Sequence, residues 1–330
     1  MDAGEIERRM REARVPGLAL AVVRDGAIER IESHGLVDVA AGRRVTDDTL
    51  FEAASLSKPV FAYAVLQLVD AGGLSLDTPL RDVVPDHLAD DPGITVRQVL
   101  SHTSGLPNWR NPEQGLEAKC YFAPGARFSY SGEGYFYLQA VMKKIAGESL
   151  DAFVRRMVFE PLEMTRSGFD LKKLPPEHVA PPYDDNSKKL EKFWRGPNAA
   201  GSLHTTAGDY ARFLEAVVNG RGLKPQTMHD WLTPMQTLPA PFAAALDPRG
   251  EPARDAAVAW GLGWGVETAE PVFFHWGSNL GFKSLAIGSA RDGAALVILA
   301  TGFDAMRLAG PLTAEILPGA RPSLRWLEFV

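Results

Sequence analysis

The stretch FEAASLSKPVF, residues 51–61, places a serine hydroxyl and a lysine amine three residues apart, at Ser55 and Lys58. Pro59 is tolerated only near the first turn of a helix, so we predict that a helix begins at Ser55. Apolar residues follow at helical spacing, which predicts a buried and rigid helix. Ser55 and Lys58 would share one face of this helix, where a partly desolvated lysine can accept the serine proton.

A Ser-x-x-Lys tetrapeptide is weak evidence when it stands alone. Serine often caps a helix, and the lysine that follows is then a solvated surface residue. The choice between a helix cap and a catalytic pair depends on the rest of the chain.

Composition excludes several classes of function. The 330 residues, 45% of them hydrophobic, predict two domains or one large composite domain with a sizeable core. A formal net charge of -6 without any basic block argues against a nucleic-acid partner. The N-terminus has no apolar segment, and the longest apolar runs, residues 17–23 and 294–300, are strand-length. We therefore expect no signal peptide, no membrane partner and a cytoplasmic location.

Thiol and metal chemistry are not favoured. Cys120 is the single cysteine, which excludes an internal disulfide and fits a reducing compartment. It lies in an irregular stretch without a partner pattern, so we do not expect it to be a nucleophile. The chain has no His-x-His or His-Glu-x-x-His spacing and no Gly-x-Ser-x-Gly elbow. We expect no metal and no cofactor.

Strand patterns lie at both ends of the chain and helical patterns lie between them. An α/β (α+β) fold is therefore expected, with a sheet region at 1–54 and 255–330, a mainly helical region at 55–254, and the active site at their interface. Residues 171–197 and 239–254 are predicted to be loops. The expected strands are 17–26, 31–39, 260–267, 272–276, 282–289 and 294–301, and the expected helices are 4–13, 94–100 with Thr95 as N-cap, 135–145, 150–158, one ending near 218, and 304–317.

Five motifs occur in a fixed order: Ser55-x-x-Lys58, residues 100–106 (LSHTSGL), residues 130–132 (YSG), residues 200–206 (AGSLHTT) and residues 275–277 (HWG). In this order they resemble the penicillin-recognising serine hydrolases, in the branch of class C β-lactamases, D-alanyl-D-alanine peptidases and family VIII carboxylesterases. The resemblance covers about residues 15–305. It implies the β-lactamase/DD-peptidase-like fold, with an antiparallel sheet built from both chain ends and flanked by helices.

The resemblance also implies roles for individual residues. Ser55 would be the nucleophile that forms an acyl-enzyme, Lys58 would lie against it, and Tyr130 would pass the proton between Ser55 and the leaving group. His275 would hold the Tyr130 network and bind a substrate carbonyl or carboxylate. The backbone N–H groups of Ser55 and Ser278 would form the oxyanion hole. Without a catalytic role, Tyr130 would be a core tyrosine and His275 a strand-end histidine. His102 and His204 are expected to be structural.

The motif at residues 130–132, which corresponds to the second motif of β-lactamases, departs from their pattern, because Gly132 replaces the asparagine of Tyr-x-Asn. This loss weakens the β-lactamase hypothesis, and restoring Asn at 132 is expected to raise β-lactam turnover. Glu133 either supplies a polar group or starts the next helix. Expected substrate-binding residues are Asn108, Trp109, Glu133, Trp276 and Gly277, which would form an apolar, aromatic-walled cleft.

Two classes of function remain open. The first is a serine acyl hydrolase for a small-molecule ester or amide, with a carboxylesterase for small or apolar acyl esters preferred to a D-amino-acid peptidase, an amidase or a β-lactamase. The second is a catalytically silent member of the fold that binds a ligand. The retention of Ser55, Lys58 and Tyr130 argues against the second class, because a binding protein needs no proton-transfer groups.

Overall fold

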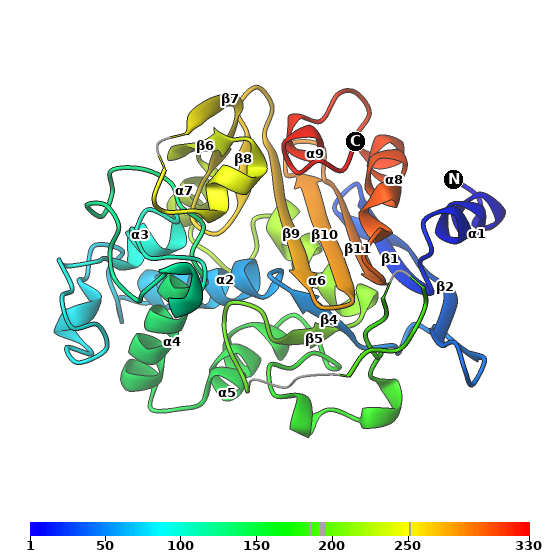
Figure 1. The fold of residues 1–330 in the computed structure, drawn as a ribbon, viewed down its shortest axis with the longest axis horizontal. Coiled ribbons are helices and arrows are strands. Elements are labelled where there is room, and N and C mark those ends of the chain that lie inside the picture. The colour runs from blue at the N-terminus through cyan, green and yellow to red at the C-terminus, as the bar shows by residue number, and fades with distance from the viewer. Residues whose placement is uncertain (185, 192–195, 251) are drawn as a thin grey trace.

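The computed structural model describes residues 1–184, 186–191, 196–250 and 252–330. Within these ranges nine strands form one antiparallel sheet in the order β3-β2-β1-β11-β10-β9-β8-β7-β6 (Figure 1). The strands near the two chain ends pair in its middle, with Leu18 opposite Ala300, so the expected sheet built from both ends is confirmed. The strand bounds are β1 (Gly17–Arg24), β2 (Ala27–Asp38), β3 (Arg43–Arg44), β6 (Gln236–Ala240), β7 (Ala253–Trp260), β8 (Gly265–Glu267), β9 (Val272–Asn279), β10 (Phe282–Ser289) and β11 (Ala294–Thr301).

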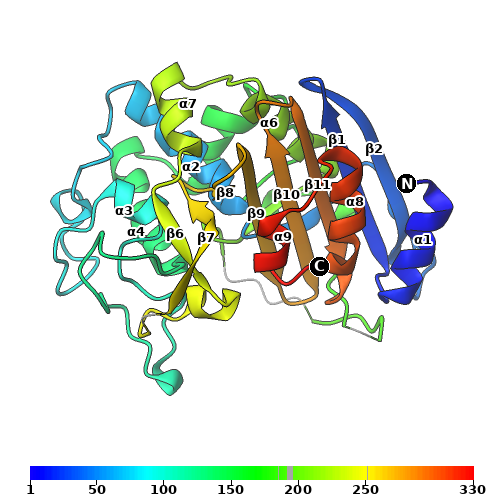
Figure 2. The ribbon, with the colours of Figure 1, turned by 90° about the horizontal axis from the view of Figure 1, so that it is seen from above.

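The central strands β1, β9, β10 and β11 are buried on both faces of the sheet. Successive side chains of a strand point to opposite faces, so Ala21 of β1 enters one hydrophobic cluster while Val22 enters the other. This explains why residues 17–23 are a continuous apolar run rather than an alternating one. α6 (Ala207–Val218) covers the first face, and α1 (Ala3–Glu12), α8 (Ala309–Ile316) and α9 (Pro322–Trp326) cover the second (Figure 2).

A helical region packs beyond the first face. It consists of α2 (Ser57–Asp70), α3 (Val96–Leu100), α4 (Gly132–Ala146), α5 (Leu150–Val154) and α7 (Pro225–Leu232). The first ten residues of α2 are all buried, as its apolar pattern predicts. Thr95 caps α3 with a complete capping box, and Gly147 ends α4 in the left-handed conformation.

A short two-stranded sheet connects the two regions. β4 (Phe51–Ala54) pairs with β5 (Leu203–Thr205), contacts β9, β10 and β11, and leads directly into α2. β4 approaches β9 closely at Gly277, where an added Cβ would lie 2.4 Å from the carbonyl oxygen of Ala53. The absence of a side chain at 277 therefore lets β9 lie against the strand that precedes Ser55.

The sequence-based prediction was wrong between residues 236 and 267. The expected loop at 239–254 contains the end of β6 and the start of β7, and the expected strand at 260–267 is divided between β7 and β8. Pro239 favoured the loop prediction, because proline has no N–H to donate to a neighbouring strand. β6 is an edge strand, where this missing N–H is tolerated. The division occurs at Gly263, which has φ 109° and leaves the extended conformation. β6 lies within residues 55–254 and yet belongs to the main sheet.

Candidate active site

Ser55 follows a strained turn between β4 and α2. Ala54 has φ 50°, a left-handed conformation that costs an L-residue about 1–2 kcal/mol. The Ser57 hydroxyl holds this turn, because it donates to the Ala54 carbonyl at 2.6 Å and accepts from the Leu203 N–H at 2.9 Å. The turn leaves Ser55 half-buried, whereas its neighbours Ala54, Leu56 and Ser57 are fully buried.

Lys58 is completely buried against Ser55. Its Nζ lies 3.2 Å from Ser55 Oγ and donates to the Ala200 carbonyl at 2.7 Å. Burial lowers the pKa of Lys58 well below its ordinary value. A neutral amine beside a serine hydroxyl can accept the hydroxyl proton, which is the chemistry that a general base supplies.

Tyr130 lies close to both groups, with its ring centre 4.7 Å from Lys58 Nζ and its hydroxyl near that of Ser55. Burial raises the pKa of Tyr130, and the nearby Ser55 hydroxyl lowers it to a smaller extent. No hydrogen bond of ordinary geometry joins Tyr130 Oη to another group within the described ranges, although the oxygen is buried. The phenol is therefore protonated in the resting site and has an unused hydrogen-bonding capacity.

His275 is fully buried on β9 with its ring centre 6.1 Å from that of Tyr130. Its Nδ1 lies 2.8 Å from the Trp276 carbonyl oxygen, which can only accept, so Nδ1 carries the proton. Burial and then the neighbouring Lys58 lower the pKa of His275 well below its ordinary value. The ring is neutral, and its Nε2 is an acceptor without a partner in the described part of the chain.

The N–H group of Ser278 faces an open edge of the sheet. A two-residue turn joins β9 to β10, and Asn279 opposite Phe282 closes it. Because hydrogen-bonded and non-hydrogen-bonded pairs alternate in an antiparallel ladder, the Ser278 N–H points away from β10. β8 pairs with β9 only at Phe273 and Phe274, so it leaves this edge uncovered.

Glu133 and Asn108 both hold the start of α4. Glu133 lies in the first turn and binds Arg110, with Oε2 2.6 Å from Arg110 Nη2 and Oε1 accepting the Arg110 N–H at 3.0 Å. The two readings of Glu133 are thus compatible, since it starts the helix and also supplies a charged group. The Asn108 carbonyl accepts the N–H groups of Gly132 and Glu133 at 2.9 and 3.1 Å.

Trp109 closes the space beside Gly132. A Cβ at position 132 would lie 2.7 Å from both the Asn108 carbonyl oxygen and the Trp109 ring. The ring also packs on Phe136, with centroids 5.8 Å apart, and the side chain is 41% exposed. An asparagine at 132 therefore does not fit without moving main-chain atoms, which removes the basis for expecting it to restore β-lactam turnover.

Trp276 lies on the opposite face of β9 from His275. It belongs to the second hydrophobic cluster and packs on Phe242 and Trp326, with ring centroids 5.1 and 5.7 Å away. It also supports the Tyr130 ring at 5.0 Å. Trp276 is not among the described residues that line the neighbouring cavity, and Gly277 packs against β4.

A cavity of about 900 Å³ has Ser278 and Gly201 in its wall. A Cβ added at Gly201 would lie 4.0 Å from the Ala54 carbonyl carbon, whereas Ser55, Lys58, Tyr130 and His275 are not among the described residues that line the cavity. The size and mixed character of the wall suit a small organic molecule. The wall has polar groups (Asn198, Ser202, Ser278, Asn279), aromatic or apolar groups (Trp109, Phe136, Pro182, Leu280, Phe282, Phe303), charged or titratable groups (Glu52, His87, Arg110, Glu133, Glu191, Lys283) and two glycines (Gly196, Gly201).

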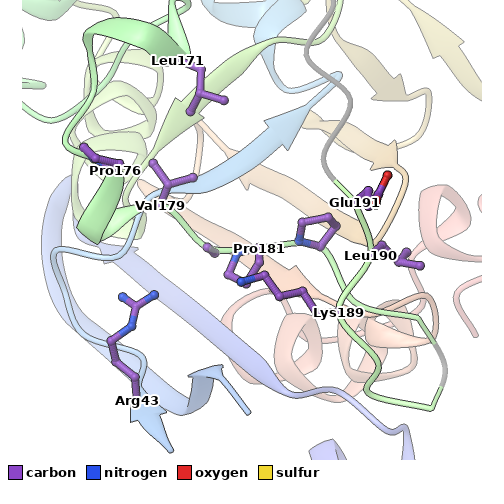
Figure 3. A pocket seen from close by; sticks show the side chains of 10 residues that line it. Arg43, Leu171, Pro176, Val179, Pro181, Lys189, Leu190 and Glu191 are labelled. Atoms are coloured by element: carbon purple, nitrogen blue, oxygen red, sulfur yellow. The ribbon is translucent and has the colours of Figure 1, made fainter. Parts of the chain in front are cut away.

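A second cavity, of about 830 Å³, lies apart from the predicted catalytic residues (Figure 3). Arg43 of β3 and side chains from residues 171–191 surround it, including Leu171, Val179 and Leu190. Pro182 and Glu191 border both cavities. None of the predicted catalytic residues contributes to the described wall of this second cavity.

In the described part of the chain, no group of three or more His, Cys, Asp or Glu side chains is placed to hold a metal ion. Across those same residues, no helix combines the length and apolar character needed to cross a bilayer.

Sequence reasoning missed several groups in or beside the site. The Ala200 carbonyl, the αL turn at Ala54 and the amide of Asn279, which donates to Glu52 and to the Gly201 carbonyl, were not anticipated. Neither the position of a main-chain carbonyl nor the left-handed backbone conformation of an alanine can be recognised from the residue types alone. Asn279 lies two residues after the end of the fifth motif, so its position near His275-Trp-Gly was the available signal.

Comparison with known proteins places these features in context. The family described as Beta-lactamase matches residues 3–319. Esterase EstB from Burkholderia gladioli is 28% identical, with 94% of this chain and 92% of that protein covered. Penicillin-binding protein 4 from Amycolatopsis lactamdurans is 29% identical, with 93% and 86% covered.

The solved structure of an octameric penicillin-binding protein homologue from Pyrococcus abyssi shares the fold. Its TM-score is 0.80 at 23% identity, covering 96% of this chain and 77% of that one. The β-lactamase/DD-peptidase-like fold expected from the five motifs is therefore confirmed.

Proposed function

This chain belongs to the beta-lactamase family and is a serine hydrolase, and from that premise we propose that it is a carboxylesterase acting on small or apolar acyl esters. The observation that carries the proposal is the buried Lys58 amine, 3.2 Å from Ser55 Oγ, with a pKa well below its ordinary value. The likeness to an esterase over nearly the whole chain supports the choice of substrate.

The proposed reaction begins when Ser55 Oγ attacks the ester carbonyl and Lys58 Nζ takes the hydroxyl proton. The N–H groups of Ser55 and Ser278 bind the carbonyl oxygen as it becomes negative. Tyr130, which holds its proton in the resting site, protonates the leaving alkoxide and recovers a proton from Lys58. Water then hydrolyses the acyl-enzyme by the same steps in reverse, and the acceptor Nε2 of His275 orients the Tyr130 hydroxyl or the entering water.

The cavity wall supports esters rather than β-lactams. Trp109 and the Asn108 carbonyl fill the space where the second-motif asparagine of a β-lactamase would stand, so no side-chain amide meets the substrate there. Trp109 and Phe136 offer an apolar surface for an acyl chain, and Glu133 holds Arg110 beside them. Trp276 is proposed to act through Tyr130, and Gly277 through the approach of β4 to β9. The expected cytoplasmic location stays a prediction.

One substrate panel tests this proposal. It compares p-nitrophenyl acetate, butyrate and octanoate with a D-alanine p-nitroanilide and a chromogenic cephalosporin, using one preparation of wild type and one of Ser55→Ala. We expect the highest kcat/KM on a short-chain ester and no turnover by Ser55→Ala. A higher kcat/KM on the cephalosporin or the D-amino-acid amide would overturn the ester assignment.

Labelling tests the nucleophile separately. A serine-reactive phosphonate should modify one peptide, and tandem mass spectrometry should place the adduct on Ser55. Modification of Ser57 or Ser104 would contradict the assignment, and the absence of both labelling and turnover would favour a catalytically silent binding protein.

A further inference from the structure

His102 belongs to the motif at residues 100–106 and accepts hydrogen bonds from both chain neighbours of Tyr130. The main-chain carbonyl of His102 accepts the Ser129 N–H at 2.8 Å, and its ring Nδ1 accepts the Ser131 N–H at 3.0 Å. These two donors are the residues immediately before and after Tyr130. His102 itself has φ 54°, an uncommon conformation for a residue with a side chain.

The His102 ring also packs directly on the Tyr130 ring. Their centroids are 4.3 Å apart at an interplanar angle of 34°, and the imidazole is fully buried. Tyr135 and Trp260 pack on the same imidazole at 5.4 and 5.1 Å. One residue, His102, therefore contacts the ring of Tyr130 and holds the backbone on both sides of it.

The two buried histidines of the site are fixed in opposite tautomers. A backbone N–H can only donate, so His102 Nδ1 is unprotonated and the neutral ring carries its proton on Nε2. His275 is the reverse, with the proton on Nδ1 and a bare Nε2. Protonating His102 would set an N–H against the Ser131 N–H, and burial together with Lys58 and His275 keeps the pKa of His102 well below its ordinary value.

We propose that His102 is a positioning residue for the reaction: its main-chain carbonyl holds the Ser129 N–H and its ring Nδ1 holds the Ser131 N–H, which fixes Tyr130 between them. Its Nε2–H is a donor without a partner in the described part of the chain. The inference rests on the proposed role of Tyr130.

Kinetics of two variants at one position test the proposal. His102→Leu removes the acceptor for Ser131 N–H, whereas His102→Asn keeps an oxygen close to the position of Nδ1. We expect His102→Leu to lower kcat on p-nitrophenyl butyrate about a hundredfold with KM changed less than about threefold, and His102→Asn to regain about tenfold. His34→Asn, which changes a buried histidine on β2 far from Tyr130, should leave kcat within about twofold.

A double-mutant cycle separates positioning from general loss of structure. If His102 acts through Tyr130, His102→Leu should cost less than about threefold in kcat when Tyr130 is already Phe. Penalties that multiply would overturn the proposal, and so would a Tyr130→Phe variant with wild-type kcat.

NMR of the wild-type protein tests the tautomers without any variant or substrate. Long-range ¹H–¹⁵N spectra of histidine-labelled protein at pH 7 should show the Nε2–H form of His102 and the Nδ1–H form of His275. A His102 ring with a proton on Nδ1 would overturn the inference. Because this readout needs no activity, it stays informative if the ester assignment itself fails.

Discussion

Lys58 is a fully buried lysine whose amine contacts the Ser55 hydroxyl and the Ala200 carbonyl. Neither group carries a negative charge, so the hydrogen bonds do not repay the cost of burying an ammonium ion. Burial therefore favours the neutral amine and lowers the pKa of Lys58. The energetic cost of this side chain is thus linked directly to its availability as a base.

Replacing Lys58 by Met should change how stability depends on pH. The folded pKa of Lys58 is lowered, so the unfolded chain binds more protons and wild-type stability rises with pH toward the unfolded pKa of about 10.4. The rise is at most about 1.4 kcal/mol per pH unit, and Lys58→Met should lack it. Urea unfolding at pH 7, 8.5 and 10 measures this, with the exposed Lys143→Met as control. Parallel curves for wild type and Lys58→Met would contradict the prediction.

Tyr130 and Lys58 should behave as one proton-handling unit. Each group passes the proton to the other, so Tyr130→Phe and Lys58→Ala should each lower kcat by about a hundredfold or more, and the double variant should lose little beyond the larger single loss. Steady-state kinetics on p-nitrophenyl butyrate gives the four values of this cycle. Additive losses would mean that the two residues serve separate steps.

At the scale of elements, the site depends on how closely β9 approaches β4. A methyl group on Gly277 would lie 2.1 Å from Ser284 Oγ and 2.4 Å from the Ala53 carbonyl oxygen, so the strands must separate. We expect Gly277→Ala to cost about 1–3 kcal/mol in stability and to lower kcat, because Ser55 moves relative to Ser278. Gly250→Ala has no atom within 4 Å of the new methyl and is the matched control. Equal melting temperatures for the two variants would contradict the prediction, because they would show that β4 can move away from β9 without a cost in stability.

The junction between Trp109 and α4 gives a second prediction at this scale. Gly132→Asn should lower the melting temperature and ester turnover without creating cephalosporin turnover, because its Cβ meets the Asn108 carbonyl as well as the Trp109 ring. Cephalosporin hydrolysis above that of wild type would show that Trp109 and the main chain move aside.

Sequence patterns located the elements that carry strong local signals. Thr95 and Gly147 marked a helix start and a helix end because capping is a local interaction. α4, predicted to begin near 135, in fact starts at Gly132, because the Ser131 hydroxyl accepts the Gly134 N–H and compensates for two glycines in the first turn. The contact of Lys58 with the Ala200 carbonyl joins residues 142 positions apart, and no local pattern encodes such a contact.

For the whole molecule, the buried bases predict instability in acid. The folded pKa values of His102 and His275 are lowered, so the unfolded chain takes up more protons as the pH falls below the ordinary histidine pKa of about 6.5. Each group should remove up to about 1.4 kcal/mol of stability per pH unit below that value, until its own folded pKa is reached. Urea midpoints should therefore fall from pH 7 to pH 5, and His102→Leu should show a shallower fall. A wild-type midpoint that is constant or rises toward pH 5 would contradict this.

The pairing of Leu18 with Ala300 has a consequence for the timing of synthesis. A ribosome adds about 5–20 residues per second, so β1 leaves the exit tunnel tens of seconds before its partner β11. Ser55 and Lys58 are also made early, whereas His275 and Ser278 come near the end of translation. A nascent chain thus carries the proposed nucleophile and the proposed base long before the proposed oxyanion site exists. The cell receives hydrolytic activity from this protein only when translation is almost complete.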